Sequence, residues 1–147
     1  MFRLGSEWLA VPAGMLDEVI AQRPTHALPH RRGHAAVGLV SVRGDIVVHV
    51  SLAGLLGISD DSATHADRRV HAVPRVVVVA DDRGRLAFTA DEVLGFHSYA
   101  PATLRPVPST LAQAIRSYAV AMLAVGDRVV GVLDGASMVA SLSLLLS

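Results

Sequence analysis

Three histidines at four-residue spacing form the most metal-like pattern in this sequence. On a helix, His26, His30 and His34 would share one face, an arrangement that could bind zinc. However, Pro29 and Gly33 interrupt any helix here, and no acidic residue lies between the histidines. The pattern therefore indicates a solvated loop, and we expect no metal and no cofactor.

Hydrolytic chemistry is poorly supported. Ser98 follows His97, and Asp91 is close in sequence, but adjacent residues of a strand point to opposite faces and no nucleophile-elbow motif is present. Asp81 and Asp82 precede a glycine in an expected hairpin, where aspartate is ordinary turn chemistry. We therefore expect no catalytic residue and no enzymatic activity.

Arg43 is the strongest candidate for a functional residue. It lies beside Gly44 at a tight turn between two very apolar segments, a costly place for an unpaired charge. Glu18 is the natural partner. Two interpretations stay open: the pair shapes an interaction groove, or Arg43 is a solvent-facing turn residue. Gly44 is expected to supply a positive φ or a close backbone approach.

Short apolar runs separated by tight turns must position these residues, and this organisation is typical of small β-barrels or sandwiches. Four β-hairpins are predicted, pairing residues 2–4 with 8–11, 37–42 with 46–50, 76–80 with 86–90, and 118–125 with 129–133. A further strand is expected over residues 91–97, and loops over 21–35 and 59–67.

Helices are expected to be few and short. Pro12 suits the start of one over residues 12–20, and a turn or two is expected within 109–118. Ser51 can cap a helix that Gly57 ends. Asp134 caps a final helix in which Met138, Leu142 and Leu145 repeat at helical spacing. His49, inside an apolar run, either points outward or is a hydrogen-bonded core residue.

Composition narrows the possible partners and the location. The 147-residue chain is 52% hydrophobic with no net charge, so neither nucleic acid nor membrane insertion is expected. The absence of cysteine excludes disulfides and thiolate metal sites. No run reaches the ~18–20 apolar residues of a membrane span, and no signal peptide is recognisable. The chain is therefore expected to be cytoplasmic.

The order of these segments resembles the CheW-like domain family. The most specific element is Gly38, three residues, then Val42-Arg43-Gly44 and a buried strand over 46–48. Further resemblance covers residues 2–12, 18–20, 52–57, 88–95, 104–108 and 130–134. Each element alone is common, but their order and spacing over one whole chain make the resemblance fairly specific.

The resemblance implies a single CheW-like domain over residues 1–147, with two intertwined five-stranded SH3-like barrels and a C-terminal helix. It implies a non-catalytic adaptor that couples chemoreceptors to a CheA-type histidine kinase in a bacterial chemosensory array. The regulatory domain of the kinase, which has the same fold, and other CheW-like domains would pair at barrel ends. The receptor hairpin tip would dock between the barrels, and the implied partner-binding residues are Glu18, Val42, Arg43 and Gly44.

The sequence also departs from the family pattern. Charged or otherwise typical family residues are replaced by Ser41, Val48, Ser51, Ala53 and Ala87. One alternative is therefore a divergent CheW-like protein that has lost kinase or receptor contacts and acts as a competitor, a spacer or an adaptor in a non-chemotaxis system. Another is a barrel that binds a small molecule, although no cluster of aromatic and polar residues supports it.

Overall fold

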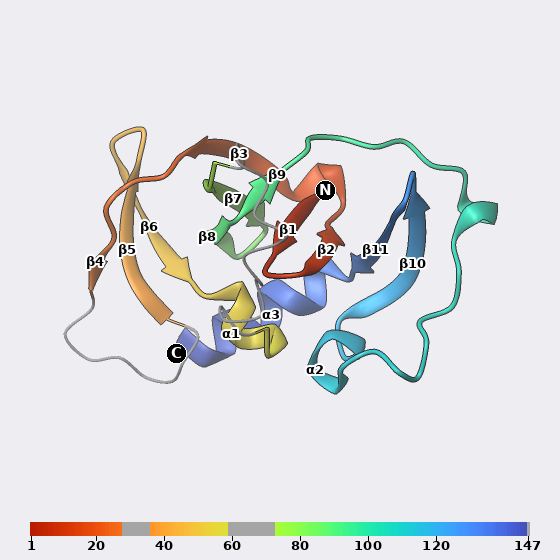
Figure 1. The fold of residues 1–147 in the computed structure, drawn as a ribbon. Helices are drawn as coiled ribbons and strands as arrows, with labels where there is room; N and C mark the ends of the chain where they lie inside the picture. The colour runs from red at the N-terminus through yellow and green to blue at the C-terminus, as the bar shows by residue number, and fades with distance from the viewer. Residues whose placement is uncertain (28–35, 59–72, 147) are drawn as a thin grey trace.

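Two β-sheets make up most of the protein, and short helices pack along one edge of the pair (Figure 1). This computed structural model describes residues 1–27, 36–58 and 73–146. Within these ranges, no helix is both long and apolar enough to cross a membrane.

The first sheet joins strands from both ends of the sequence. In spatial order its strands are β10 (Ala119–Val125), β11 (Arg128–Leu133), β2 (Glu7–Ala10), β1 (Phe2–Leu4) and β9 (Glu92–Val93). β2 and β11 run parallel, whereas the other neighbours are antiparallel. The N-terminal hairpin thus lies between two segments from the second half of the chain.

The second sheet is built from the middle of the chain. In spatial order its strands are β3 (Leu16–Ala21), β7 (Arg75–Asp81), β8 (Gly84–Ala90), β6 (Asp45–Val50), β5 (Ala36–Val42) and β4 (His26–Ala27). Only β6 and β8 run parallel to each other. The chain leaves the first sheet after β2, forms the whole second sheet, and returns at β9.

The predicted mainly-β fold, with two sheets and a C-terminal helix, α3 (Gly135–Leu146), is confirmed. The four predicted hairpins are also present. The second sheet contains one strand more than the expected five, because the two-residue β4 pairs with β5. A Cβ at Gly38 would overlap the carbonyl oxygen of His26, so β4 can approach only a glycine here.

The β5–β6 hairpin closes through a two-residue turn. Val42 pairs with Asp45, and the intervening Arg43 and Gly44 have φ values of 49° and 83°. Two successive positive φ values define a type I′ turn, whose twist matches that of the flanking strands. The positive φ expected at Gly44 is confirmed, and Arg43 adopts a backbone conformation that is uncommon for a side chain of its size.

The predicted helix over residues 12–20 is wrong. One 3₁₀ turn, η1 (Ala13–Met15), is followed by β3, in which every second residue from Leu16 is partly buried. The segment has apolar residues at helical spacing but also at alternating positions, and it is too short for periodicity to decide. Pairing of β3 with β7 decides in favour of the strand.

The strand expected over residues 91–97 is shorter than predicted. Only β9 pairs, and Gly95 then adopts a φ of 87°, which turns the chain away from β1. The chain continues without regular structure to a 3₁₀ turn, η3 (Pro101–Thr103). The expected helical turn within 109–118 is present as α2 (Gln113–Arg116).

Local capping explains the other helices. In α1 (Leu52–Leu56), the Ser51 hydroxyl accepts a hydrogen bond from the Gly54 amide at 3.0 Å, and Gly57 ends the helix with a φ of 66°. Both expectations are confirmed.

The C-terminal helix α3 begins as predicted. The Asp134 carboxylate accepts hydrogen bonds from the amide and hydroxyl of Ser137, which lower the Asp134 pKa. Of the three residues at helical spacing, Met138 and Leu142 are buried, whereas Leu145 is 44% exposed. The packed face continues through other residues, including Val139.

The two sheets share one hydrophobic core. Phe2 of β1 and Phe88 of β8 lie with ring centroids 5.1 Å apart, and buried residues of α1 and α3 join the same cluster. A smaller cluster, which includes Val42, lies within the second sheet alone. Because both sheets pack on common side chains, their relative position is set by the core.

Several sequence-based expectations fall outside the described residues. These are the positions of His30 and His34 and the loop over residues 59–67. His26, the first member of the histidine series, lies on β4 and is exposed.

Candidate partner-binding groove

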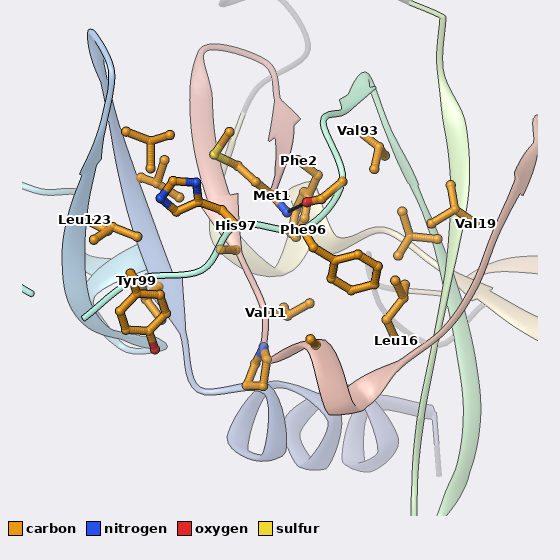
Figure 2. Close-up of a pocket in the computed structure, with 18 of the residues that line it drawn as sticks. Met1, Phe2, Val11, Leu16, Val19, Val93, Phe96, His97, Tyr99 and Leu123 are labelled. Carbon is orange, nitrogen blue, oxygen red and sulfur yellow. Dashed lines mark hydrogen bonds between the residues drawn. The ribbon is translucent and has the colours of Figure 1, made fainter. Parts of the chain in front are cut away.

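An apolar groove of about 600 Å³ lies between the two sheets. One wall comes from β1, β2, β10 and β11, and the other from η1, β3 and β7, with the segment after β9 passing along it (Figure 2). Most lining side chains are aliphatic, among them Val11, Leu16, Val19, Val77, Val93, Leu123, Val125, Val130 and Val132. Its volume is in the range of pockets that bind small ligands or individual partner side chains.

Two aromatic side chains enter this groove from the segment after β9. Phe96 is 75% exposed and lies beside Val11 and Leu16, while Tyr99 is 46% exposed on the side of Leu123 (Figure 2). Large aromatic side chains that remain this accessible show that the groove is open to solvent. Such surfaces are typical of binding sites.

The N-terminus anchors the start of this aromatic segment. The Met1 amino group donates a hydrogen bond to the Gly95 carbonyl at 2.9 Å, and the Met1 carbonyl accepts one from the Leu94 amide at 2.9 Å. Burial lowers the pKa of this amino group. Phe96 therefore directly follows two residues, Leu94 and Gly95, whose backbone is held by Met1.

The predicted pair of Glu18 and Arg43 is present. The Arg43 Nε donates to the Glu18 Oε1 at 2.5 Å. The Arg43 side chain is 79% exposed, so Arg43 faces solvent at the turn. The Glu18 side chain is only 14% exposed, and its carboxylate is the group that needs a partner.

A second ionic cluster lies at the same end of the second sheet. Arg85 of β8 donates to the carboxylates of Asp17 on β3 and Asp45 on β6, each at 3.1 Å. Both clusters join β3, an edge of the strand order, to the β5–β6 hairpin near the opposite edge. Contact between distant members of the strand order shows that the sheet curls, and these ion pairs tie its ends together.

The four predicted site residues do not line the groove. Val42 is fully buried in the smaller cluster, so its side chain supports the turn from beneath. Gly44 lies exposed at the turn. The connection to the groove runs through β3, where Val19, next to Glu18, faces the groove.

The departures from the family pattern have structural roles. Ser51 caps α1, Val48 packs against the shared core, and Ala87 is fully buried in the smaller cluster. These residues therefore suit the fold of this chain.

The other chemical candidates are not assembled into a site. The Asp91 carboxylate accepts a hydrogen bond from the Gly5 amide at 2.7 Å, which makes it part of a turn. Asp81 likewise accepts from the Arg83 amide. Among the residues that the structure describes, no three His, Asp or Glu side chains gather where they could hold a metal ion.

Sequence reasoning missed the groove residues. Phe96 and Tyr99 carry the one recognisable signal, since they lie three positions apart in a chain with only three Phe, two Tyr and one Trp. The aliphatic residues of the wall look like ordinary strand residues. Their shared exposure to the groove depends on how the two sheets pack.

The architecture defines a β-barrel binding domain whose accessible features are a groove between sheets and an ion-paired barrel end. The model of the CheW-like domain family matches residues 1–143, so the chain belongs to that family. Among solved structures, it resembles the scaffolding protein TtCheW from Thermoanaerobacter tengcongensis, with a TM-score of 0.71 and 16% identity, over 90% of this chain and 80% of that one. No curated protein matches.

These comparisons confirm the predicted fold, including its SH3-like character. Family membership supports a coupling or adaptor role in general terms.

Proposed function

We propose that this chain is a non-catalytic, cytoplasmic adaptor that couples chemoreceptors to a CheA-type histidine kinase. The observation that carries the proposal is the open apolar groove between two sheets held rigidly by a shared core. An aliphatic groove of this kind suits the apolar face of a helix, which is a recurring mode of partner recognition. The helical tip of a receptor hairpin would occupy it.

The kinase regulatory domain would bind at a barrel end. Ile46, beside the β5–β6 turn, is 67% exposed, and it gives that end an apolar contact. Arg43 and Gly44 form the turn beside Ile46, Glu18 of β3 pairs with Arg43, and Val42 supports the turn from the core. The proposal therefore retains these four residues as part of the partner-binding region.

The domain would act as one unit, because residues of both barrels contribute to one core. A rigid unit can pass a change in one contact to another through their fixed geometry. If the two barrels moved independently, a change at one contact would no longer be passed to the other.

Co-purification with two separate partners tests the proposal. A chemoreceptor hairpin-tip fragment and a kinase regulatory domain should each bind the purified chain. Val19→Asp, which puts a charge into the groove, should abolish binding of the receptor fragment. Val129→Asp is the matched control, because Val129 is exposed on β11 and does not line the groove. Failure of the wild-type chain to bind the receptor fragment would refute the receptor-coupling role.

A divergent adaptor that has lost its kinase contact is the second candidate. It is favoured by Ser51 and Ala53, which stand where the family pattern has charged residues; Ser51 here serves as a helix cap. Binding of the receptor fragment without binding of the kinase domain would support this candidate. Strong binding of the kinase domain would exclude it.

A further inference from the structure

Arg75, the first residue of β7, is the one permanently charged side chain that lines the groove among the described residues. No aspartate or glutamate lines it in these ranges. His97 is the other basic side chain of the lining. The groove is therefore apolar with a basic edge, and no acidic side chain among its described lining residues neutralises the charge of Arg75.

Three acidic residues of the described strands β3 and β9 are paired with other arginines. Within the described ranges, the Arg75 guanidinium makes no hydrogen bond or ion pair. The occupied pairs are Asp17–Arg85, Glu18–Arg43 and Arg3–Glu92. Among the described residues, Arg75 thus differs from Arg85, Arg43 and Arg3 in having its guanidinium donors available.

An unpaired guanidinium beside an apolar surface favours a particular ligand chemistry. Its planar donors match the two oxygens of a carboxylate, and the surrounding aliphatic side chains reduce competition from water. A partner that buried only apolar groups here would leave this charge desolvated and unpaired, which is unfavourable. The complementary occupant is an amphipathic helix with one acidic residue beside its apolar face.

We propose that Arg75 is the charge anchor of the groove and binds an aspartate or glutamate of a helical partner. This inference rests on the proposed receptor-binding function and adds the chemistry that selects the helix and its orientation. The apolar contacts supply area, whereas the single ion pair determines which way round the helix lies.

Charge reversal on both sides tests this anchor. The probe is a chemoreceptor hairpin-tip fragment, together with variants in which each acidic residue is changed to arginine in turn. We expect Arg75→Gln to weaken binding of the unmodified fragment about fivefold. Arg75→Glu should weaken it about tenfold, because repulsion is added to the lost pair. One charge-reversed fragment should recover its affinity for the Arg75→Glu chain.

Arg83→Glu provides the matched control, since Arg83 lies on the β7–β8 turn, outside the groove lining, and carries the same charge change. It should bind the fragment within twofold of wild type. Equal thermal melting of the Arg75 variants and wild type would show that the fold is preserved.

Two outcomes separate the failure of this inference from failure of the function. If the wild-type chain does not bind the fragment at all, the receptor-binding function and the anchor both fail. If wild type and Arg75→Glu bind equally, or if no reversed fragment restores binding, the function stands and the anchor is refuted. A binding difference between wild type and Arg75→Gln that shrinks from about 50 mM to about 500 mM NaCl would support the ionic interaction.

Discussion

Replacing Arg43 by alanine and, separately, by glycine distinguishes its structural role from a role in binding. Both changes remove the guanidinium that pairs with Glu18 at 2.5 Å. They differ in the backbone, because Arg43 has a φ of 49°. Alanine retains the unfavourable conformation, whereas glycine adopts it readily.

The structure sets the expected magnitudes. With the Arg43 side chain 79% exposed, the ion pair should contribute about 0.5–1 kcal/mol. The left-handed conformation costs a residue other than glycine about 1 kcal/mol or more, part of which is offset by the larger unfolded-state entropy of glycine. We expect Arg43→Ala to lower the free energy of unfolding by about 1 kcal/mol, and Arg43→Gly to stay within about 0.5 kcal/mol of wild type.

Urea denaturation followed by tryptophan fluorescence measures these changes. Trp8 is the only tryptophan, and the Arg128 guanidinium carbon lies 4.5 Å from the centroid of the Trp8 ring. Because both residues belong to the first sheet, Trp8 fluorescence reports whether that sheet is folded. A double-mutant cycle with Glu18→Gln should give a coupling energy of about 0.5–1 kcal/mol. Strict additivity would refute the stabilising role of the pair.

Binding of the Arg43→Gly chain then tests the partner-binding role. This variant should be as stable as wild type yet bind the receptor fragment or the kinase domain at least about fivefold more weakly. Unchanged affinity for both partners would leave Arg43 with only a structural role.

Three further predictions concern stability. His49 is 8% exposed and contacts the hydroxyls of Thr25 and Thr89, and burial lowers the pKa of its imidazole. Because the unfolded chain then binds the His49 proton more readily than the folded chain, protonation favours unfolding. The free energy of unfolding should therefore be highest above about pH 6.5 and should fall as the pH decreases below that value. Urea titrations across this range should show the slope, and His49→Gln should reduce it; an identical slope would contradict the assignment. Gly38→Ala should destabilise the chain by about 1–3 kcal/mol in thermal melts, because the new Cβ overlaps the His26 carbonyl, whereas an unchanged melting temperature would show that β4 is dispensable. Because the two sheets share one core, Trp8 fluorescence and far-UV circular dichroism should report one coincident transition, and separated midpoints would indicate independent barrels.

Turn chemistry made the hairpins predictable from sequence alone. Gly44, Gly84 and Gly126 follow or interrupt apolar runs, and each has a positive φ in the structure. The caps Ser51 and Asp134 were also predictable, because each hydrogen-bonds an amide three residues later. These features depend on interactions within a few residues, which is why local patterns determine them. The family signature around Arg43 is also a local feature, because it spans only a few consecutive residues at the β5–β6 turn.

Where local patterns were ambiguous, tertiary pairing decided the structure. Residues 16–21 satisfy both helical and alternating spacing, and the ladder with β7 makes them a strand. Residues 94–97 have strand-like composition, but Gly95 turns them away from β1 toward the groove. The first outcome depends on a partner strand that is distant in sequence, and the second on the positive φ of Gly95, which the strand-like residues around it conceal.

Some of the proposed partner-binding residues could be found from the sequence, and others only from the structure. Sequence pattern identified Arg43 and its acidic partner Glu18, but only the structure shows that the carboxylate is the buried member and that Val42 lies in the core. The groove and the Arg75 guanidinium within it had no sequence signature, because the groove is formed where the packing of the two sheets brings together strands that are distant in sequence. The sequence by itself determined the hairpin strands, their turns and the family; the packing of the strands decided the ambiguous segments and which side chains remain available to a partner.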